Sequence, residues 1–194
     1  MRVQQLARII LACAFLFQLQ SCGGVAAHAS VDDGVVVNDV TQLNPIRVAA
    51  VQTPLSIEEI QQLVREHKGP IAIGGGRYSQ GGQTATEGAL QIDMRQFNQV
   101  VALSTADKTV TVQTGITWRQ LQEILDPHDL SLKIMQTYAN FTVGGSLSVN
   151  VHGRYIGQGP LVRAVRTIKL VLADGSLVTC SPSENAELFY GAIG

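Results

Sequence analysis

Short apolar runs alternate with polar and glycine-rich stretches along most of this chain, a pattern that predicts short strands and short helices. Residues 47–51 and 71–73 are apolar runs typical of strands. Between them, residues 57–64 carry apolar side chains at the spacing of one helical face, and Ser56 with Glu59 has the spacing of a capping box. This strand–helix–strand order predicts a small βαβ unit, whose second strand leads into a glycine-rich stretch.

The middle of the chain predicts a hairpin followed by a second helix. Residues 100–103 and 110–113 are apolar or β-branched runs on either side of a polar turn, as in a hairpin. Thr117 and Gln120 repeat the capping-box spacing. In the helix that they open, we expect Trp118 to pack against a sheet rather than to stack on a ligand.

A second hairpin and a last helix are predicted near the end of the chain. Residues 165–172 and 177–180 are strand patterns joined by an Asp-Gly turn. The first of them is apolar on both faces, so we expect it to be covered on both sides. Cys180 is expected to be a small buried hydrophobe. Ser183 is expected to cap the last helix, and Ile193 is expected to lack a packing partner.

Composition and charge exclude several classes of function. The chain has 194 residues, of which 45% are hydrophobic, with 14 basic and 15 acidic residues. This is enough for one core of ordinary size, either undivided or split into two lobes. The nearly balanced charge gives no electrostatic footprint for nucleic acid, so we expect no nucleic-acid partner. The histidines are too scattered along the sequence for a metal-ligand spacing, and no metal site is expected.

Residues 1–29 are predicted to be a signal peptide rather than part of the fold. Basic residues precede an apolar run that is too short to span a bilayer, and Ala27-His28-Ala29 offers a cleavage site of small residues. A competing pattern, Leu-Gln-Ser-Cys, resembles a bacterial lipobox in which Cys22 would carry a lipid anchor. We therefore expect export, to the periplasm or as a membrane-anchored lipoprotein facing it. Residues 30–39 are small and polar and are expected to be a linker.

The stretch from Ile71 to Gln83 carries the strongest chemical signal. Its apolar start breaks into a loop with five glycines, whose N–H groups can converge on one point. Arg77 adds a fixed positive charge, and Ser79 and Gln83 add side-chain donors, a combination that suits a phosphate or pyrophosphate. The stretch lacks the last glycine of the dinucleotide fingerprint and the lysine of a P-loop. The loop's own amides, rather than a helix N-terminus, would therefore hold the phosphates.

Residues 142–153, Thr-Val-Gly-Gly-Ser-Leu-Ser-Val-Asn-Val-His-Gly, form a second stretch of this kind. Thr142 is expected to cap a short helix. The first N–H groups of that helix, from Val143, Gly144 and Gly145, would then be free donors at the positive end of the helix dipole. The sequence thus predicts a second anion site here.

The two stretches, in this order, resemble the FAD-binding (PCMH-type) domain of the vanillyl-alcohol oxidase and p-cresol methylhydroxylase flavoprotein superfamily. The resemblance covers residues 40–194. It implies an α+β, two-lobed fold, with a small βαβ lobe and a mixed or antiparallel sheet with helices. It also implies FAD as cofactor and assigns to FAD binding Gly74, Gly75, Gly76, Arg77, Tyr78, Ser79, Gly81, Gly82, Gln83, Thr142, Gly144, Gly145, Ser148, His152, Gly153 and Val165.

Two departures from the family pattern change the expectation. Many members carry a histidine at the position of Arg77, and that histidine bonds covalently to the flavin. A guanidinium stays protonated and cannot act as that nucleophile, so we expect non-covalent FAD. Family members also continue into a substrate domain. We therefore expect the domain to be incomplete here, with no catalytic residue, and a small-molecule substrate to bind only with a C-terminal part. A natural truncation, a gene fragment and half of a split enzyme all stay open.

The leading functional hypothesis is the FAD-binding portion of an exported flavin-dependent oxidoreductase. Such an enzyme would oxidise a small molecule bearing a hydroxyl or amine group by hydride transfer to FAD. The alternative is a non-catalytic or degenerate fragment that binds FAD or a nucleotide. A reductase of cell-wall precursors on the same fold is a third hypothesis, which the predicted leader disfavours because that class works in the cytoplasm.

Overall fold

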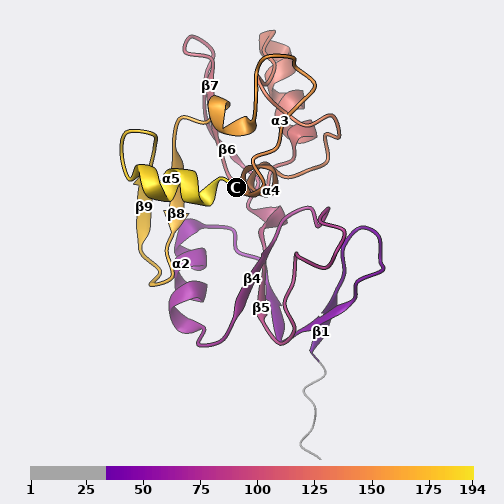
Figure 1. Ribbon diagram of the computed structural model, residues 1–194. Coiled ribbons are helices and arrows are strands. Elements are labelled where there is room, and N and C mark those ends of the chain that lie inside the picture. Colours follow the sequence, from indigo (N-terminus) through magenta and orange to yellow (C-terminus); the bar gives the residue numbers. More distant parts are fainter. Residues whose placement is uncertain (1–33) are drawn as a thin grey trace, which may run out of the picture. The chain divides into compact units, whose positions relative to one another are not determined.

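A three-stranded parallel sheet organises the first half of the chain (Figure 1). In the computed structural model, which describes residues 34–194, β5 (Leu90–Asp93) lies between β3 (Ala50–Gln52) and β4 (Ile71–Gly74) and pairs in parallel with both. Helix α2 (Ile57–Glu66) connects β3 to β4. The predicted βαβ unit is therefore confirmed, with β5 inserted between its two strands.

The strand predicted at residues 47–51 is divided between two sheets. β2 (Ile46–Val48) pairs antiparallel with β1 (Val35–Val37), whereas β3 belongs to the parallel sheet. The chain bends between them at Ala49, whose N–H donates to the carbonyl of Ala89. The presence of β1 also shows that residues 35–37 form a strand where the sequence predicts a linker. The predicted signal peptide and Cys22 lie outside the described residues.

Helix α2 has one of its two predicted capping bonds. Ser56 Oγ accepts a hydrogen bond from the N–H of Glu59, but the Glu59 carboxylate accepts from the N–H of Leu55 instead of that of Ser56. No residue of α2 is fully buried. The helix contacts a turn late in the chain: the side chains of Gln61 and Arg65 both donate to the carbonyl of Gly175, at 2.8 and 3.2 Å.

The second half of the chain contains two antiparallel hairpins, each a sheet of its own, and the small sheets and short helices of the described residues confirm the expected α+β class. β6 (Val100–Ser104) pairs with β7 (Thr109–Val112), and β8 (Ile168–Val171) pairs with β9 (Leu177–Cys180). β8 is shorter than predicted, because residues 165–167, which follow the 3₁₀ helix η3 (Leu161–Ala164), and residue 172 are not in the strand. The other 3₁₀ turns are η1 (Met94–Gln96) and η2 (Asp126–His128). The two expected lobes are parts of one compact unit, Gly34–Gly194.

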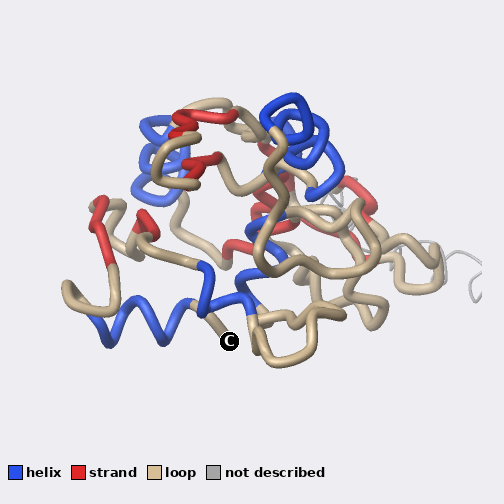
Figure 2. Tube along the Cα trace, turned by 90° about the horizontal axis from the view of Figure 1, so that it is seen from above, coloured by secondary structure: helices blue, strands red, loops and turns tan. Residues whose placement is uncertain are grey.

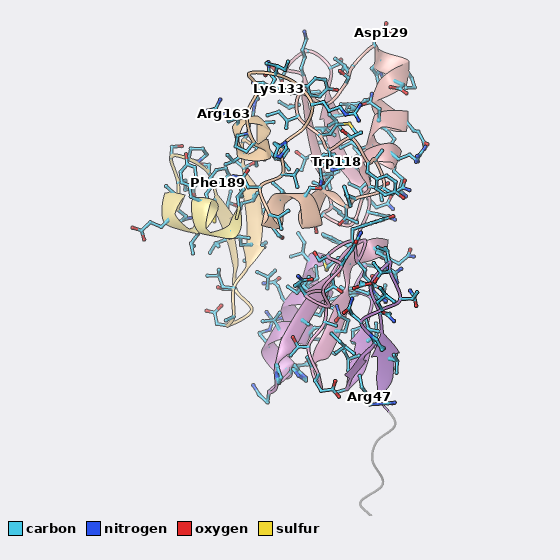
Figure 3. All side chains as sticks on the ribbon, turned by 45° about the vertical axis from the view of Figure 1, so that its right-hand side comes forward. Arg47, Trp118, Asp129, Lys133, Arg163 and Phe189 are labelled. Carbon is cyan, nitrogen blue, oxygen red and sulfur yellow. The ribbon has the colours of Figure 1, made fainter. Side chains whose placement is uncertain are left out.

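Helices α3 (Trp118–Leu125) and α4 (Val143–Ser148) contribute to the larger core. α3 begins with the complete capping box of Thr117 and Gln120 that the sequence predicts. Trp118, labelled in Figure 3, is only 3% exposed, and its Nε1 donates to Ser146 Oγ of α4 at 2.9 Å. The prediction that this tryptophan packs inside the protein is confirmed.

A smaller core joins helix α5 (Ala186–Ala192) to the second hairpin. Its buried members are Cys180, Phe189 (labelled in Figure 3) and Ile193. Two predictions are wrong here. Asn185 rather than Ser183 precedes the helix, at a left-handed φ of 51°, and Ile193 is buried at 5% exposure. Figure 2 shows the last residues beside α4, where a Cβ on Gly194 would lie 2.4 Å from the carbonyl oxygen of Ser148.

Candidate cofactor-binding site

The glycine loop, residues 74–83, begins where β4 ends, at the carboxyl edge of the parallel sheet. Within the described residues, the N–H groups of Gly75, Gly76, Tyr78 and Ser79 donate no hydrogen bond to another residue. Consecutive N–H groups without an acceptor are the donors that anion-binding loops use. The loop therefore has the free donors that the sequence predicts for it.

Arg77 holds an unfavourable backbone conformation in the middle of this loop. Its φ is +60°, a region that costs a residue with a Cβ about 1–2 kcal/mol. The side chain turns down to the sheet, where NH2 lies 3.0 Å from Asp93 Oδ2, and its Nε is buried without a hydrogen-bond partner among the described residues. The backbone carbonyl accepts from the N–H of Val40 at 3.0 Å. Strain of this kind persists where surrounding contacts impose it, and it is frequent at binding sites.

Asp93, at the end of β5, forms ion pairs with Arg77 and Arg95. Arg95 contacts both carboxylate oxygens, through Nε at 2.9 and 3.1 Å and through NH2. Burial by itself raises the pKa of the Asp93 carboxyl, but the hydrogen bonds from Arg95 and the charges of Arg95 and Arg77 outweigh it, and the pKa lies below its ordinary value. Because two guanidinium groups share one carboxylate, the cluster keeps one excess positive charge directly below the glycine loop.

The glycine loop lies against residues 138–142, so the fold brings the two predicted stretches together. A Cβ on Gly75 would lie 2.4 Å from Thr142 Oγ1. The ring of Tyr78 packs edge-on against Tyr138 and Phe141, with centroid distances of 5.3 and 4.8 Å. Gly75 is therefore a position of close approach, at which only hydrogen fits beside the first residue of the second stretch.

The sequence predicts an anion site formed by free N–H groups at the start of α4. This prediction is wrong, because two of those N–H groups are already paired within the protein. Thr142 does cap this helix, since its Oγ1 accepts from the N–H of Gly145 at 3.4 Å. However, the N–H of Val143 donates to the carbonyl of Ile116, and that of Gly144 donates to the carbonyl of Thr114. The first donors of α4 thus hold the helix against residues 114–116, and α4 has only six residues. An assignment of these residues to FAD rests on the resemblance and on the close approach of Thr142 to Gly75 of the glycine loop.

His152 lies beside the aromatic side chains of Tyr138 and Phe141. An open pocket of about 480 Å³ includes His152, Tyr138 and Phe141 in its lining. The His152 side chain is exposed, and its nearest polar contact is a long one, 3.4 Å to the carbonyl of Gly153. Gly153 packs closely, because a Cβ there would lie 2.3 Å from the carbonyl oxygen of Met135. The imidazole is therefore available to a ligand in this pocket.

The remaining predicted residues make contacts within the protein. Ser148 Oγ donates to the carbonyl of Gly144 in its own helix. The Gln83 side chain accepts from the N–H of Gly81, and Gly82 lies beside Ile46. The far end of the glycine loop is held by Asn44, whose amide donates to the carbonyl of Gln80 at 3.1 Å. The half-buried side chain of Val165 packs against both cores.

Sequence reasoning missed two charged members of the site, Asp93 and Arg95. The signal was present, since a carboxylate directly follows the apolar run of β5 and an arginine follows two residues later.

Within residues 34–194 no three histidine, cysteine, aspartate or glutamate side chains gather as metal ligands. The same part of the chain contains no helix with the length and apolarity needed to cross a bilayer.

The residues present fit the pyrophosphate of FAD. The glycine loop supplies N–H donors that have no acceptor among the described residues, and Arg77 and Arg95 leave an excess positive charge beside it. Arg77 Nε is a buried donor in need of an acceptor.

Comparison with known proteins agrees with this reading of the site. The family model described as FAD binding domain matches residues 45–181. L-gulonolactone oxidase of Bos taurus is 33% identical over 142 residues, which are 72% of this chain and 32% of that protein. Cytokinin dehydrogenase 4 of Oryza sativa subsp. japonica is 27% identical over 218 aligned positions, covering 95% of this chain and 41% of that protein.

Decaprenylphosphoryl-beta-D-ribose oxidase of Mycolicibacterium smegmatis is 30% identical over 129 residues, 66% of this chain and 28% of that protein. The chain thus spans roughly a third of the length of such relatives. The matched region contains both the glycine loop and residues 142–153. The chain belongs to the FAD-binding domain family of the flavin oxidoreductases in the vanillyl-alcohol oxidase and p-cresol methylhydroxylase superfamily.

Proposed function

We propose that this chain is the FAD-binding portion of an exported oxidoreductase that acts on a small molecule bearing a hydroxyl or amine group. The observation that carries the proposal is the row of free N–H donors above the excess positive charge of Arg77, Arg95 and Asp93. When bound, FAD supplies a two-electron acceptor for a hydride from a carbon bearing the hydroxyl or amine. The names of two relatives, L-gulonolactone oxidase and cytokinin dehydrogenase 4, support the oxidation of a small molecule.

The residues of this chain bind and orient the cofactor. In the proposal, Gly75 and Gly76 admit the pyrophosphate because they have no Cβ, their N–H groups donate to its oxygens, and Arg77 balances its charge. His152 and Gly153 line the neighbouring part of the site, beside the pocket that Tyr138 and Phe141 share. We assign no catalytic residue within residues 34–194.

Export is the second element of the proposal, and it rests on the pattern of residues 1–29. Mass spectrometry of the mature N-terminus tests it. A chain that begins at Ser30 supports a periplasmic protein, and a chain that begins at a lipid-modified Cys22 supports a membrane anchor. An N-terminus at Met1 in the native host contradicts export.

Titration calorimetry with FAD, ADP and FMN tests the cofactor site. FAD and ADP both carry a pyrophosphate and are expected to bind, whereas FMN, with one phosphate, should bind at least about tenfold more weakly because it leaves some loop donors unpaired. Equal affinity for FAD and FMN would contradict a pyrophosphate site in the glycine loop. A screen of hydroxyl and amine donors with a reducible dye then separates an oxidoreductase from the alternative, a non-catalytic FAD-binding module.

We expect the bound FAD to be released by acid. Covalent attachment needs a nucleophilic side chain, and Arg77 is a protonated guanidinium at the position of the expected histidine. Acid precipitation of the FAD-loaded protein should leave a yellow supernatant and a colourless pellet. Flavin that stays with the precipitated protein after washing would contradict the prediction.

Replacement of Arg77 by alanine should weaken FAD binding by about 1.5–3 kcal/mol, the value of charge-assisted hydrogen bonds. Arg77→Gly should weaken it similarly although it relieves the strained φ of +60°, since glycine also removes the charge. Calorimetry measures both. The matched control is Arg166→Ala, because Arg166 is exposed and outside the glycine loop. Loss of affinity in the control, or none in the two variants, would remove Arg77 from the site.

A further inference from the structure

Three buried side-chain polar atoms have no hydrogen-bond partner among the described residues, and they belong to two neighbouring side chains. They are Nε of Arg77 and both Nε2 and Oε1 of Gln91. Native proteins pair nearly all buried polar atoms, so a group of unpaired ones at one place points to a partner that another state of the site provides. Arg77 belongs to the proposed cofactor site, but Gln91 is so far without a role.

Gln91 lies directly beneath the glycine loop. It is in the central strand β5 and is 0% exposed. In the parallel register Gln91 lies beside Ala72, and Asp93 lies beside Gly74, so the side chains of Gln91 and Asp93 are on the same face of the sheet. A Cβ on Gly74 would lie 2.7 Å from Gln91 Nε2 and 3.6 Å from the carbonyl oxygen of Thr84. The carboxamide thus fills the space between the first glycine of the loop and the segment that returns to β5.

Packing alone does not explain a glutamine at this position. Its strand neighbours Leu90 and Ile92 are apolar and buried, and a methionine or leucine would fill a similar volume without an unpaired amide. A carboxamide offers two donors and an acceptor beside a loop that has several unpaired backbone N–H groups. The chemistry of Gln91 therefore matches the backbone of the glycine loop.

We propose that Gln91 is a positioning residue for the cofactor: when FAD binds, its carboxamide forms hydrogen bonds with the backbone of residues 74–84 and so fixes the glycine loop in its binding conformation. The Thr84 carbonyl, which like Nε2 faces the space beside Gly74, is the acceptor for Nε2, and loop N–H groups that do not face the phosphates are donors for Oε1. Gln91 does not touch the phosphates itself. This inference rests on the proposed FAD-binding function.

The test compares Gln91→Met with wild type in two measurements. Removal of an unpaired buried amide should leave the thermal midpoint of the cofactor-free protein unchanged or higher, because nothing in that state pairs with the amide. FAD affinity, measured by calorimetry, should fall about tenfold or more, the loss of one to two hydrogen bonds in the bound state. The matched control is Gln62→Met, the same chemical change on the exposed side of α2, which should alter neither value.

Affinity within twofold of wild type in a folded Gln91→Met protein overturns the inference, whatever its thermal midpoint, because Gln91 is then only a structural residue. If wild type itself does not bind FAD, the proposed function fails instead. Should the variant not fold, nitrogen-resolved NMR of the wild-type side-chain amide decides. A shift of the Gln91 carboxamide resonances on addition of FAD supports the hydrogen bonds, and unchanged resonances overturn them.

Discussion

Gly75→Val is expected to abolish FAD binding while the parallel sheet remains folded. Any Cβ at this position would lie 2.4 Å from Thr142 Oγ1, so the glycine loop must move away from residues 138–142. A valine adds two methyl groups on the side that Thr142 already fills, so the loop must move further than for a single Cβ. Because the row of N–H donors then loses its alignment, we expect affinity to fall at least about a hundredfold. Calorimetry measures the affinity, and circular dichroism checks the fold.

Two further variants make this prediction specific. Gly191→Ala is the control for glycine replacement, since a Cβ there meets no atom within 4 Å. In a Gly75→Ala background, Thr142→Gly removes the side chain that the new Cβ would strike and should restore part of the binding. It costs α4 its cap, which for glycine in place of threonine is only about a few tenths of a kcal/mol of stability. Wild-type affinity in folded Gly75→Val would show that phosphates do not bind at this loop.

Asp93→Asn is expected to lower the free energy of unfolding by about 2–4 kcal/mol. The substitution keeps the shape of the side chain but removes the only carboxylate that the structure places on Arg77 and Arg95 within the described residues. The two guanidinium groups then repel each other, and the half-buried charge of Arg77 has no counter-ion. Urea denaturation at neutral pH measures the effect.

The stabilisation by Asp93 should depend on pH in a defined direction. Its folded-state pKa is lowered, so the carboxylate contributes fully above the pKa of an unfolded aspartate, about 3.9, and the contribution is lost as pH falls below that value. The difference between wild type and Asp93→Asn should therefore be constant between pH 7 and 5 and shrink below about pH 4. Asp129→Asn is the control, because asparagine tolerates the left-handed φ of 55° there. A difference that grows on acidification would contradict the assignment.

Features set by neighbouring residues could be predicted from the sequence. The strand that breaks into glycines at residue 74 and the capping box of Thr117 and Gln120 depend on residues within a few positions of each other, and both are present. The cap at Asn185 could not be predicted, because its side chain does not cap the helix but donates to the carbonyl of Thr179 in the preceding strand. The burial of Ile193 depends on Cys180 and Phe189, so only the packed core reveals it.

The burial of the polar site residues Gln91 and Asp93 could not be predicted, because it depends on the position of β5 in the sheet. Leu-Gln-Ile-Asp at residues 90–93 alternates in the way that is typical of a strand with one face in water. In the structure this strand is central, and all four residues are buried. The partners of the α4 donors were hidden for the same kind of reason, since Thr114 and Ile116 are far from Gly144 and Val143 in sequence. Both depend on contacts between distant segments.

During protein synthesis, helix α2 cannot form its contacts with the carbonyl of Gly175 until that residue has been made. This carbonyl accepts hydrogen bonds from Gln61 and Arg65, and the first of these spans 114 residues. Ribosomes add roughly 5–20 residues per second, so α2 emerges from the exit tunnel roughly 6–23 s before the turn that receives it. During that interval Gln61 and Arg65 lack the carbonyl to which both donate in the folded protein, so these bonds form only late in synthesis.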